Sequence, residues 1–434
     1  MNTLPIPQSD VSRPLPPFEA PEPRQDAKSW VKAFIAAFAV GLAAGCAASP
    51  GSLTPANHTA SSGPRDGQNI SRALPAASPT PYPASEAGCG PGPNGGAQCS
   101  VLKGGGAPSN TPQGGLTAQQ LRAAYGLPAA PSSGVPSGPI VAIVVAFDNP
   151  HAEDNLAAYR TQFGLPACTS DNGCFQKVKL KPIPGDPPPA PPAPPKSADG
   201  STWSDESALD LAMVSAACPN CRITLVEAVG QDLDSLANAV STAATYSPAA
   251  ISNSWGVPEG GGNAPNIDAP AQAAFNHPGI AITASAGDLG AGGVQFPASS
   301  PYVTSVGGTS LSANAASARG WTETAWSGTG TGCSIMIAQP AWQSTSSCGG
   351  ARSVPDISVI GDSVNPGVAV YNRDDNGWIV LGGTSVGAPF IAGLYGAAAD
   401  FGAGTTGAPS LYANLGNLNP VAGTNGSPNG LAGF

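Results

Sequence analysis

The sequence predicts an α/β fold with a mostly parallel central sheet flanked by helices. Short runs such as Ile140–Ala146 are apolar along their whole length, which is typical of parallel strands buried on both faces. These runs alternate with stretches of helical periodicity, and two neighbouring parallel strands need such a crossover between them. At 434 residues, the chain is long enough for one large domain of this class together with extensions.

The predicted domain covers residues 114–434 and starts with a capped helix at Leu116–Tyr125. The strand Ile140–Ala146 and a helix at Ala152–Phe163 come next. Ligands in such sheets lie beyond the carboxyl ends of the strands, so reactive side chains are expected there. The later elements that we expect are strands at Ile223–Ala228, Ala249–Ser254 and Gly279–Ser285 and helices at Leu233–Tyr246 and Ala269–Asn276.

Three segments are expected before this domain. Residues 1–27 form a Pro-rich overhang, and residues 28–46 have the pattern of a signal peptide, with a twelve-residue apolar run that is too short to span a bilayer comfortably. This run ends at Cys46 in a sequence that loosely resembles a bacterial lipobox, which leaves lipidation open. Residues 47–113 are rich in Pro, Gly, Ser and Ala and are predicted to be a disordered linker. We therefore expect a secreted protein, either free or lipid-anchored to the cell surface.

Cysteine usage agrees with export. Without Cys46, eight cysteines remain and fall into four sequence-local pairs. The spacing of Cys218 and Cys221 also fits a redox motif or half of a zinc site, but no second pair at zinc spacing is apparent. Out of 105 connectivities, we predict the bridges Cys89–Cys99, Cys168–Cys174, Cys218–Cys221 and Cys333–Cys348.

The charge composition restricts the partners. A net charge of -10 and a pI near 4.6 argue against nucleic-acid binding. Only 10% of the residues are charged, which suits a protein exposed to acid because few carboxylates are lost on protonation. The Pro-rich stretch Pro182–Pro195 is expected to be an exposed polyproline-like loop.

The strongest functional signal is Gly382–Pro389, where Ser385 stands between a Gly-Thr turn and an apolar helix start. A serine in this position is built like a nucleophile, although a simple helix N-cap would have the same pattern. The sequence has three histidines, and none of them follows Ser385. A base other than histidine must therefore serve this serine if it reacts.

Two histidine-based alternatives fit less well. The pattern Gly383-x-Ser385-x-Gly387 matches the nucleophile elbow of esterases, but that fold needs its histidine after the serine. A subtilisin-type order can be assembled from Asp210, His277 and Ser385. However, His277 lies at a predicted helix end, where an imidazolium simply complements the helix dipole.

Carboxyl groups are the remaining candidate bases. Glu206 and Asp210 are one turn apart in a helix predicted from Trp203, and two adjacent carboxyls can share a proton, which raises the pKa of one of them. Asp288 follows the predicted strand Gly279–Ser285 and, if protonated, could donate to an oxyanion. Taken singly, each acid is more simply explained as a surface charge or a cap residue.

The set as a whole resembles the sedolisin family of serine-carboxyl peptidases. The resemblance covers roughly residues 114–394, and it implies a subtilisin-like fold and endopeptidase activity at acid pH. It further implies that Ser385 is the nucleophile, Glu206 the general base, Asp210 its supporting acid and Asp288 the oxyanion donor. The matching stretches are Glu206-x-x-x-Asp210, Ser285–Asp288, Gly382–Pro389, Ile251–Gly256, Val306–Thr309, Pro355–Ser358 and Gly367–Tyr371.

The sequence departs from this family in two respects. Sedolisin-like domains normally end in a calcium site with two aspartates, and here Asn419 occupies an aspartate position. Mostly neutral oxygens bind calcium weakly, so we predict no cofactor and no tight calcium site. The family also usually carries a folded prosegment, and the linker at 47–113 is not one, which leaves open how activity is restrained.

We therefore predict a monomeric, exported endopeptidase that hydrolyses proteins or peptides at acid pH through an acyl-enzyme on Ser385. The alternative is a catalytically inactive peptidase fold that serves as a binding protein on the cell surface.

Overall fold

The computed structural model describes residues 89–90, 96–181, 201–260, 267, 269–344, 346, 348–400, 407–421 and 432–433. The predicted overhang, the signal peptide with Cys46 and the insertion Pro182–Pro195 lie outside these residues. All described residues belong to one compact unit, residues 69–434. Within this described part, no helix has both the length and the apolar character needed to cross a bilayer.

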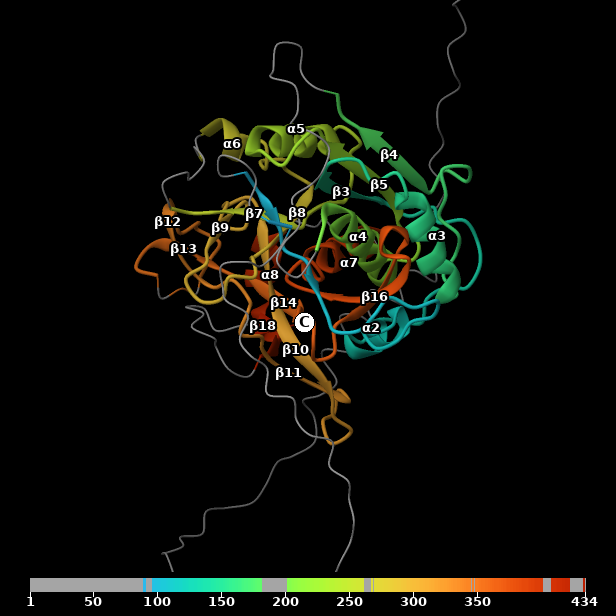
Figure 1. Ribbon diagram of the computed structural model, residues 1–434. Coiled ribbons are helices and arrows are strands. Elements are labelled where there is room, and N and C mark those ends of the chain that lie inside the picture. The colour runs from blue at the N-terminus through green and yellow to red at the C-terminus, as the bar shows by residue number, and fades with distance from the viewer. Residues whose placement is uncertain are drawn as a thin grey trace, which may run out of the picture. The chain divides into compact units, whose positions relative to one another are not determined.

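A ten-stranded sheet, counted over the described residues, forms the centre of the fold (Figure 1). All neighbouring pairs along it are parallel except β17–β18 and β10–β11. The prediction of a mostly parallel central sheet is confirmed. In spatial order the strands are β17 (Asn419–Pro420), β18 (Ala432–Gly433), β14 (Ile357–Ile360), β10 (Thr304–Ala313), β8 (Ala281–Ser285), β6 (Ala250–Asn253), β3 (Ile140–Ala146), β5 (Arg222–Ala228) and β4 (Phe175–Lys179), with β11 (Trp321–Ala325) beside β10.

Strand β3 lies inside the sheet between β5 and β6, and all its residues after Ile140 are buried. Its unbroken run of Val, Ile and Ala suits this place because both of its faces are covered. Helix α5 (Leu233–Ala244) and the pair α4 (Trp203–Ala217) and α7 (Gly387–Asp400) lie on either side of β3 and β5 in Figure 1. Helices therefore flank the sheet as predicted.

The remaining described elements support this centre. Smaller sheets are β1–β7–β9, β12–β13 and β15–β16–β2. Their strands are β1 (Gln98–Cys99), β2 (Leu102–Lys103), β7 (Trp255–Pro258), β9 (Gln295–Phe296), β12 (Gly332–Ala338), β13 (Ala351–Val354), β15 (Val368–Asn372) and β16 (Gly377–Gly382), and the other helices are α2 (Ala118–Ala124), α3 (Ala152–Gln162), α6 (Ala269–Ala273), α8 (Ala408–Tyr412), η3 (Arg373–Asp375) and η4 (Leu415–Asn417).

Helix α4 is buried along nearly its whole length. It starts with a capping box in which Thr202 and Asp205 bond each other's backbone N–H groups. Helix α7 packs closely against it, because a Cβ added to Gly393 of α7 would lie 2.6 Å from the Cβ of Ala217. Glu206 and Asp210 therefore project from a helix enclosed by protein, and the simpler explanation of solvated surface charges is wrong for them.

The linker predicted at residues 47–113 extends too far toward the C-terminus, because its last residues belong to the folded domain. Residues 96–113 fell within it, yet β1 pairs with β7, β2 pairs with β16, and Cys99 and Val101 are fully buried. For this segment the prediction of a disordered tether is wrong. Each of its strands has only two residues, and the partners lie more than 150 residues away in the sequence, so local composition carried no signal.

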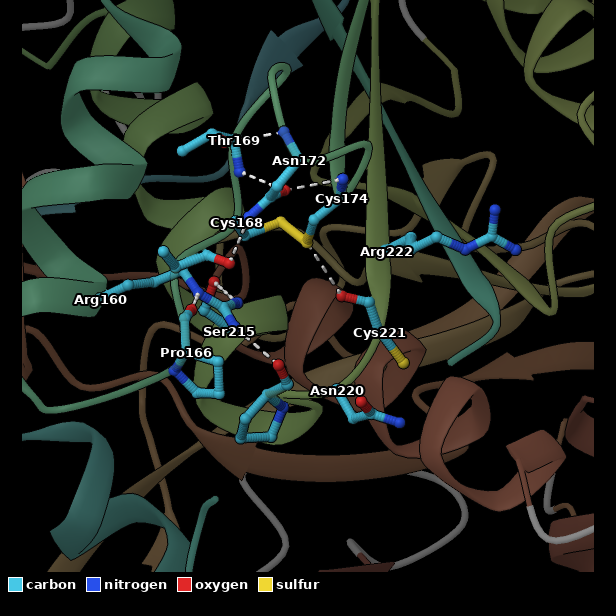
Figure 2. The surroundings of a disulfide bond; sticks show 12 residues. Arg160, Pro166, Cys168, Thr169, Asn172, Cys174, Ser215, Asn220, Cys221 and Arg222 are labelled. Atoms are coloured by element: carbon cyan, nitrogen blue, oxygen red, sulfur yellow. Dashed lines mark hydrogen bonds between the residues drawn. A yellow bond between two sulfur atoms is a disulfide. The ribbon is translucent and has the colours of Figure 1, made fainter. Parts of the chain in front are cut away.

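All four predicted disulfides are confirmed: Cys89–Cys99, Cys168–Cys174, Cys218–Cys221 and Cys333–Cys348. Figure 2 shows Arg160 near the Cys168–Cys174 disulfide and Ser215. This buried guanidinium donates to the carbonyl of Pro166, to Ser215 Oγ at 3.1 Å and to the carbonyl of Pro219 at 2.6 Å. It thereby ties α3 to α4, to the segment just before Cys168 and to the loop closed by Cys218–Cys221.

Candidate active site

Ser385 lies in the turn that joins β16 to α7. The turn begins at Gly383, whose φ of +92° favours glycine. Helix α7 starts at Gly387, so Ser385 lies between the end of a strand and the start of a helix. Its side chain is completely buried.

The Ser385 hydroxyl donates to the carboxyl of Glu206, with 2.7 Å between Oγ and Oε2. A second acceptor, the carbonyl oxygen of Ser254, lies 3.3 Å from the same hydroxyl. Among the described residues, these two groups are the acceptors of the Ser385 hydroxyl. Glu206 is thus within direct proton-transfer distance of the candidate nucleophile.

Asp210 completes a short network on the same helix. Its Oδ1 accepts from Ser254 Oγ at 2.6 Å. Its other oxygen and Glu206 Oε1 are both buried and have no hydrogen-bond partner among the described residues. Each carboxyl affects the pKa of the other, and two adjacent carboxyls can share a proton.

Burial is the main cause that raises the pKa of both carboxyls. The pKa of Asp210 is raised to about 8. That of Glu206 lies well above its usual value, because burial and the neighbouring Asp210 together outweigh the hydrogen bond from Ser385. In this enclosed state the pair stays protonated over the acid range.

Asp288 contacts the turn that carries Ser385. It follows β8 and is 7% exposed. Its Oδ1 accepts from Thr384 N at 2.8 Å and from Thr384 Oγ1 at 2.9 Å. The carboxyl is therefore fixed against the turn that carries Ser385, and the four predicted residues lie together at one place in the fold.

His277 lies apart from this group. Its Nε2 is 3.0 Å from the carbonyl oxygen of Ala274, just after α6, which is the helix-end position expected from the sequence. No hydrogen bond or ion pair with the Ser385 network is recorded for it. The histidine-based alternative has no support from this geometry.

Two site residues went unnoticed in the sequence. Ser254 bridges Asp210 and Ser385, and it was visible only as part of the stretch Ile251–Gly256. Ser100 accepts a hydrogen bond from the backbone N–H of Ser385 at 3.0 Å, although it lies in the predicted linker. No sequence pattern marked Ser100.

The described part of the C-terminal tail offers no carboxylate cluster. Asn419 is exposed in β17, which pairs with β18. Over all described residues, no group of three or more His, Cys, Asp or Glu side chains is placed to hold a metal ion. Amide and backbone oxygens alone do not fit a tight calcium site.

Comparison with known proteins gives consistent results. No family model matches the chain. Kumamolisin from Bacillus sp. (strain MN-32) is 32% identical over 278 residues, which cover 58% of this chain and 47% of kumamolisin. Sedolisin from Pseudomonas sp. (strain 101) is 38% identical over 113 residues, covering 24% of this chain and 19% of sedolisin. The chain thus spans about half of the first relative and less of the second.

A solved structure of Pseudomonas sedolisin, in complex with two molecules of pseudo-iodotyrostatin, has the same fold. It matches with a TM-score of 0.55 and 22% identity over 72% of this chain and 86% of that chain. The fold and site together define a subtilisin-like α/β protein in which carboxyl groups surround a serine. In sequence and fold the chain is similar to members of the sedolisin family of serine-carboxyl peptidases.

Proposed function

We propose that this protein is a serine-carboxyl endopeptidase that hydrolyses peptide bonds of proteins or peptides. The single observation that carries the proposal is the 2.7 Å hydrogen bond from the Ser385 hydroxyl to Glu206. A serine hydroxyl that donates to a buried carboxyl, with a second carboxyl behind it, has a base to take its proton. Similarity to kumamolisin and sedolisin supports the same reaction class.

In the proposed mechanism, Ser385 Oγ attacks the peptide carbonyl while its proton passes to Glu206. Asp210, held by Ser254, stabilises the charge and proton on Glu206. The oxyanion accepts from the backbone N–H of Ser385 and from protonated Asp288. Glu206 then returns the proton to the leaving amine, and water hydrolyses the acyl-enzyme by the reverse transfers.

We propose an acid pH range for this reaction. Asp288 can donate only while it is protonated, so activity is lost as the pH rises. Burial in the enclosed site is the first cause of the raised pKa values of Glu206 and Asp210. Once water enters an open cleft, this cause weakens and the pair can ionise in acid.

We also propose that the protein is exported and works without a tightly bound calcium ion. Four disulfides support an oxidising compartment. The exposed Asn419 at the family's aspartate position supports the absence of tight calcium binding. A lipid anchor at Cys46 stays a prediction.

One observation favours the rival function, an inactive peptidase fold that binds a partner: Ser385, Glu206 and Asp210 are all completely buried. Incubation of the purified chain with a denatured protein at pH 3 to 5 separates the two functions. We expect fragments from the native chain and none from Ser385→Ala. Equal fragment yields from both chains would show that Ser385 is not the nucleophile, and no fragments from either would favour the binding protein.

A further inference from the structure

Gln295 is a buried side chain whose amide has no hydrogen-bond partner in the described part of the chain. It lies in β9, opposite Pro258 of β7, and its exposed fraction is 0%. Both side-chain polar atoms, Nε2 and Oε1, are unpaired. Most buried polar atoms in folded proteins are hydrogen-bonded, because burial without a partner costs free energy. No other buried amide side chain among the described residues leaves both of its polar atoms unpaired.

This amide lies between two backbone segments that border Ser385. One segment contains Ser254, whose carbonyl oxygen is 3.3 Å from Ser385 Oγ, and continues to Gly256. The other contains Gly287, which directly precedes the proposed oxyanion donor. A Cβ added to Gly256 would collide with Gln295 Oε1, and a Cβ added to Gly287 would lie 2.7 Å from the same oxygen. The amide therefore lies against both glycines, and a side chain at either position would displace it.

The same region borders the place of the substrate in the proposed reaction. Ser385 Oγ attacks the carbonyl carbon of one substrate residue, called the acyl residue below, while Asp288 donates to its oxygen. The Cα of the acyl residue is one bond from the attacked carbon, so its side chain starts beside Ser385 and Asp288. Ser385 is as completely buried as Gln295 in this enclosed state, so a substrate that reaches the serine also has to open this region.

We propose that Gln295 determines specificity and that the enzyme prefers an acyl residue with an amide or a protonated carboxyl group, above all Gln or Glu. This inference rests on the proposed function. An amide has both donors and an acceptor, so the amide of a substrate Gln pairs with that of Gln295 through two reciprocal hydrogen bonds. A protonated carboxyl also offers one donor and one acceptor. An apolar side chain of similar length leaves both Gln295 atoms unpaired and is rejected.

The preference for a substrate Glu depends on pH. The ordinary pKa of a glutamate side chain is about 4.3. Below this pH the carboxyl can donate to Gln295 Oε1, and above it the carboxylate can only accept. Cleavage after Glu should therefore decrease, relative to cleavage after Gln, as the pH rises. The carboxyls of the site, Asp288, Glu206 and Asp210, are the same for both peptides at a given pH, so this ratio reports the substrate side chain.

The test measures kcat/KM for fluorogenic peptides that are identical except for Gln, Glu or Met as the acyl residue. We expect the Gln peptide to exceed the Met peptide by at least about 30-fold, as two hydrogen bonds provide. The Glu peptide should be within about threefold of the Gln peptide at pH 3 and at least about tenfold below it at pH 5.5. A Gln-to-Met ratio near one, or a Glu-to-Gln ratio that does not change with pH, would overturn the inference.

Substitutions of Gln295 separate recognition from a structural role. Gln295→Met should bring the Gln-to-Met ratio close to one, and Gln295→Glu should restore a preference for the Gln peptide at pH 3, where the new carboxyl is protonated. Gln343→Met is the matched control, because this glutamine is also buried but bonds the Ser353 carbonyl at 2.8 Å and Tyr412 at 2.9 Å. It should keep the native ratio. If Gln295→Met slows all peptides equally, the residue is structural and the inference fails.

The same peptides separate this inference from the proposed function. If the native chain cleaves them, Ser385→Ala does not, and the Gln-to-Met ratio is near one, the inference fails and the proposed function stands. If no peptide and no denatured protein is cleaved in a way that depends on Ser385, both fail.

Discussion

Glu206→Gln is the substitution that probes the proton transfer most simply. The Ser385 hydroxyl has two recorded acceptors, Glu206 Oε2 at 2.7 Å and the Ser254 carbonyl at 3.3 Å. A peptide carbonyl cannot take the proton, and a glutamine of the same shape cannot either. The base is therefore lost completely, and we expect a fall of about 10⁴-fold in turnover, or about 5.4 kcal/mol in the activation barrier.

The assay is single-turnover hydrolysis of a labelled denatured protein at pH 4. Glu227→Gln is the matched control, because this glutamate is equally buried, also has a raised pKa and lies outside the Ser385 network. The double variant Ser385→Ala with Glu206→Gln should be no slower than either single variant, since the two residues act as a unit. Retention of more than a tenth of native turnover in Glu206→Gln would refute the assigned role.

Three further predictions concern stability and metal binding. Burial raises the pKa of Glu227 to about 7, so between pH 4.5 and 7 the folded chain binds more protons than the unfolded chain. The free energy of unfolding should therefore fall as the pH rises through this range, by up to about 1.4 kcal/mol per pH unit from this group. Glu227→Gln should flatten that slope in urea titrations, and an unchanged slope would contradict the shift. Arg352→Met leaves the buried carboxylate of Asp356 without its ion pair and should cost about 3–5 kcal/mol, whereas Arg373→Met at an exposed pair should cost less than about 1 kcal/mol; equal losses would contradict this reasoning. Calorimetric titration with calcium should detect no micromolar site, and tight binding would overturn the account of Asn419.

The parallel centre of the fold could be predicted because its elements are continuous apolar runs. Strand β3 has the predicted bounds, Ile140–Ala146, since every residue in the run suits a covered strand. The sequence does not predict strand β10, because Gly307 and Gly308 interrupt its apolar pattern. A Cβ on Gly308 would come within 2.7 Å of the Trp326 ring, so this glycine reflects packing against a distant side chain.

The candidate site also contains residues that the sequence predicts and residues that it does not. Ser385, Glu206, Asp210 and Asp288 belong to motifs, and the resemblance of these motifs, in this order, to the sedolisin family grouped them. Ser100 could not be found, because its place in the site depends on pairing between short strands far apart in the sequence. The surrounding Gly and Pro residues are typical of a flexible linker and concealed an ordered segment.

The central claim is that carboxyl groups, and no histidine, serve Ser385. It is tested most directly by the pH dependence of kcat/KM for a peptide substrate. The account predicts a maximum below about pH 5 and a loss of activity toward neutral pH, as Asp288 ionises and ceases to donate. A maximum near pH 7 or above would contradict it.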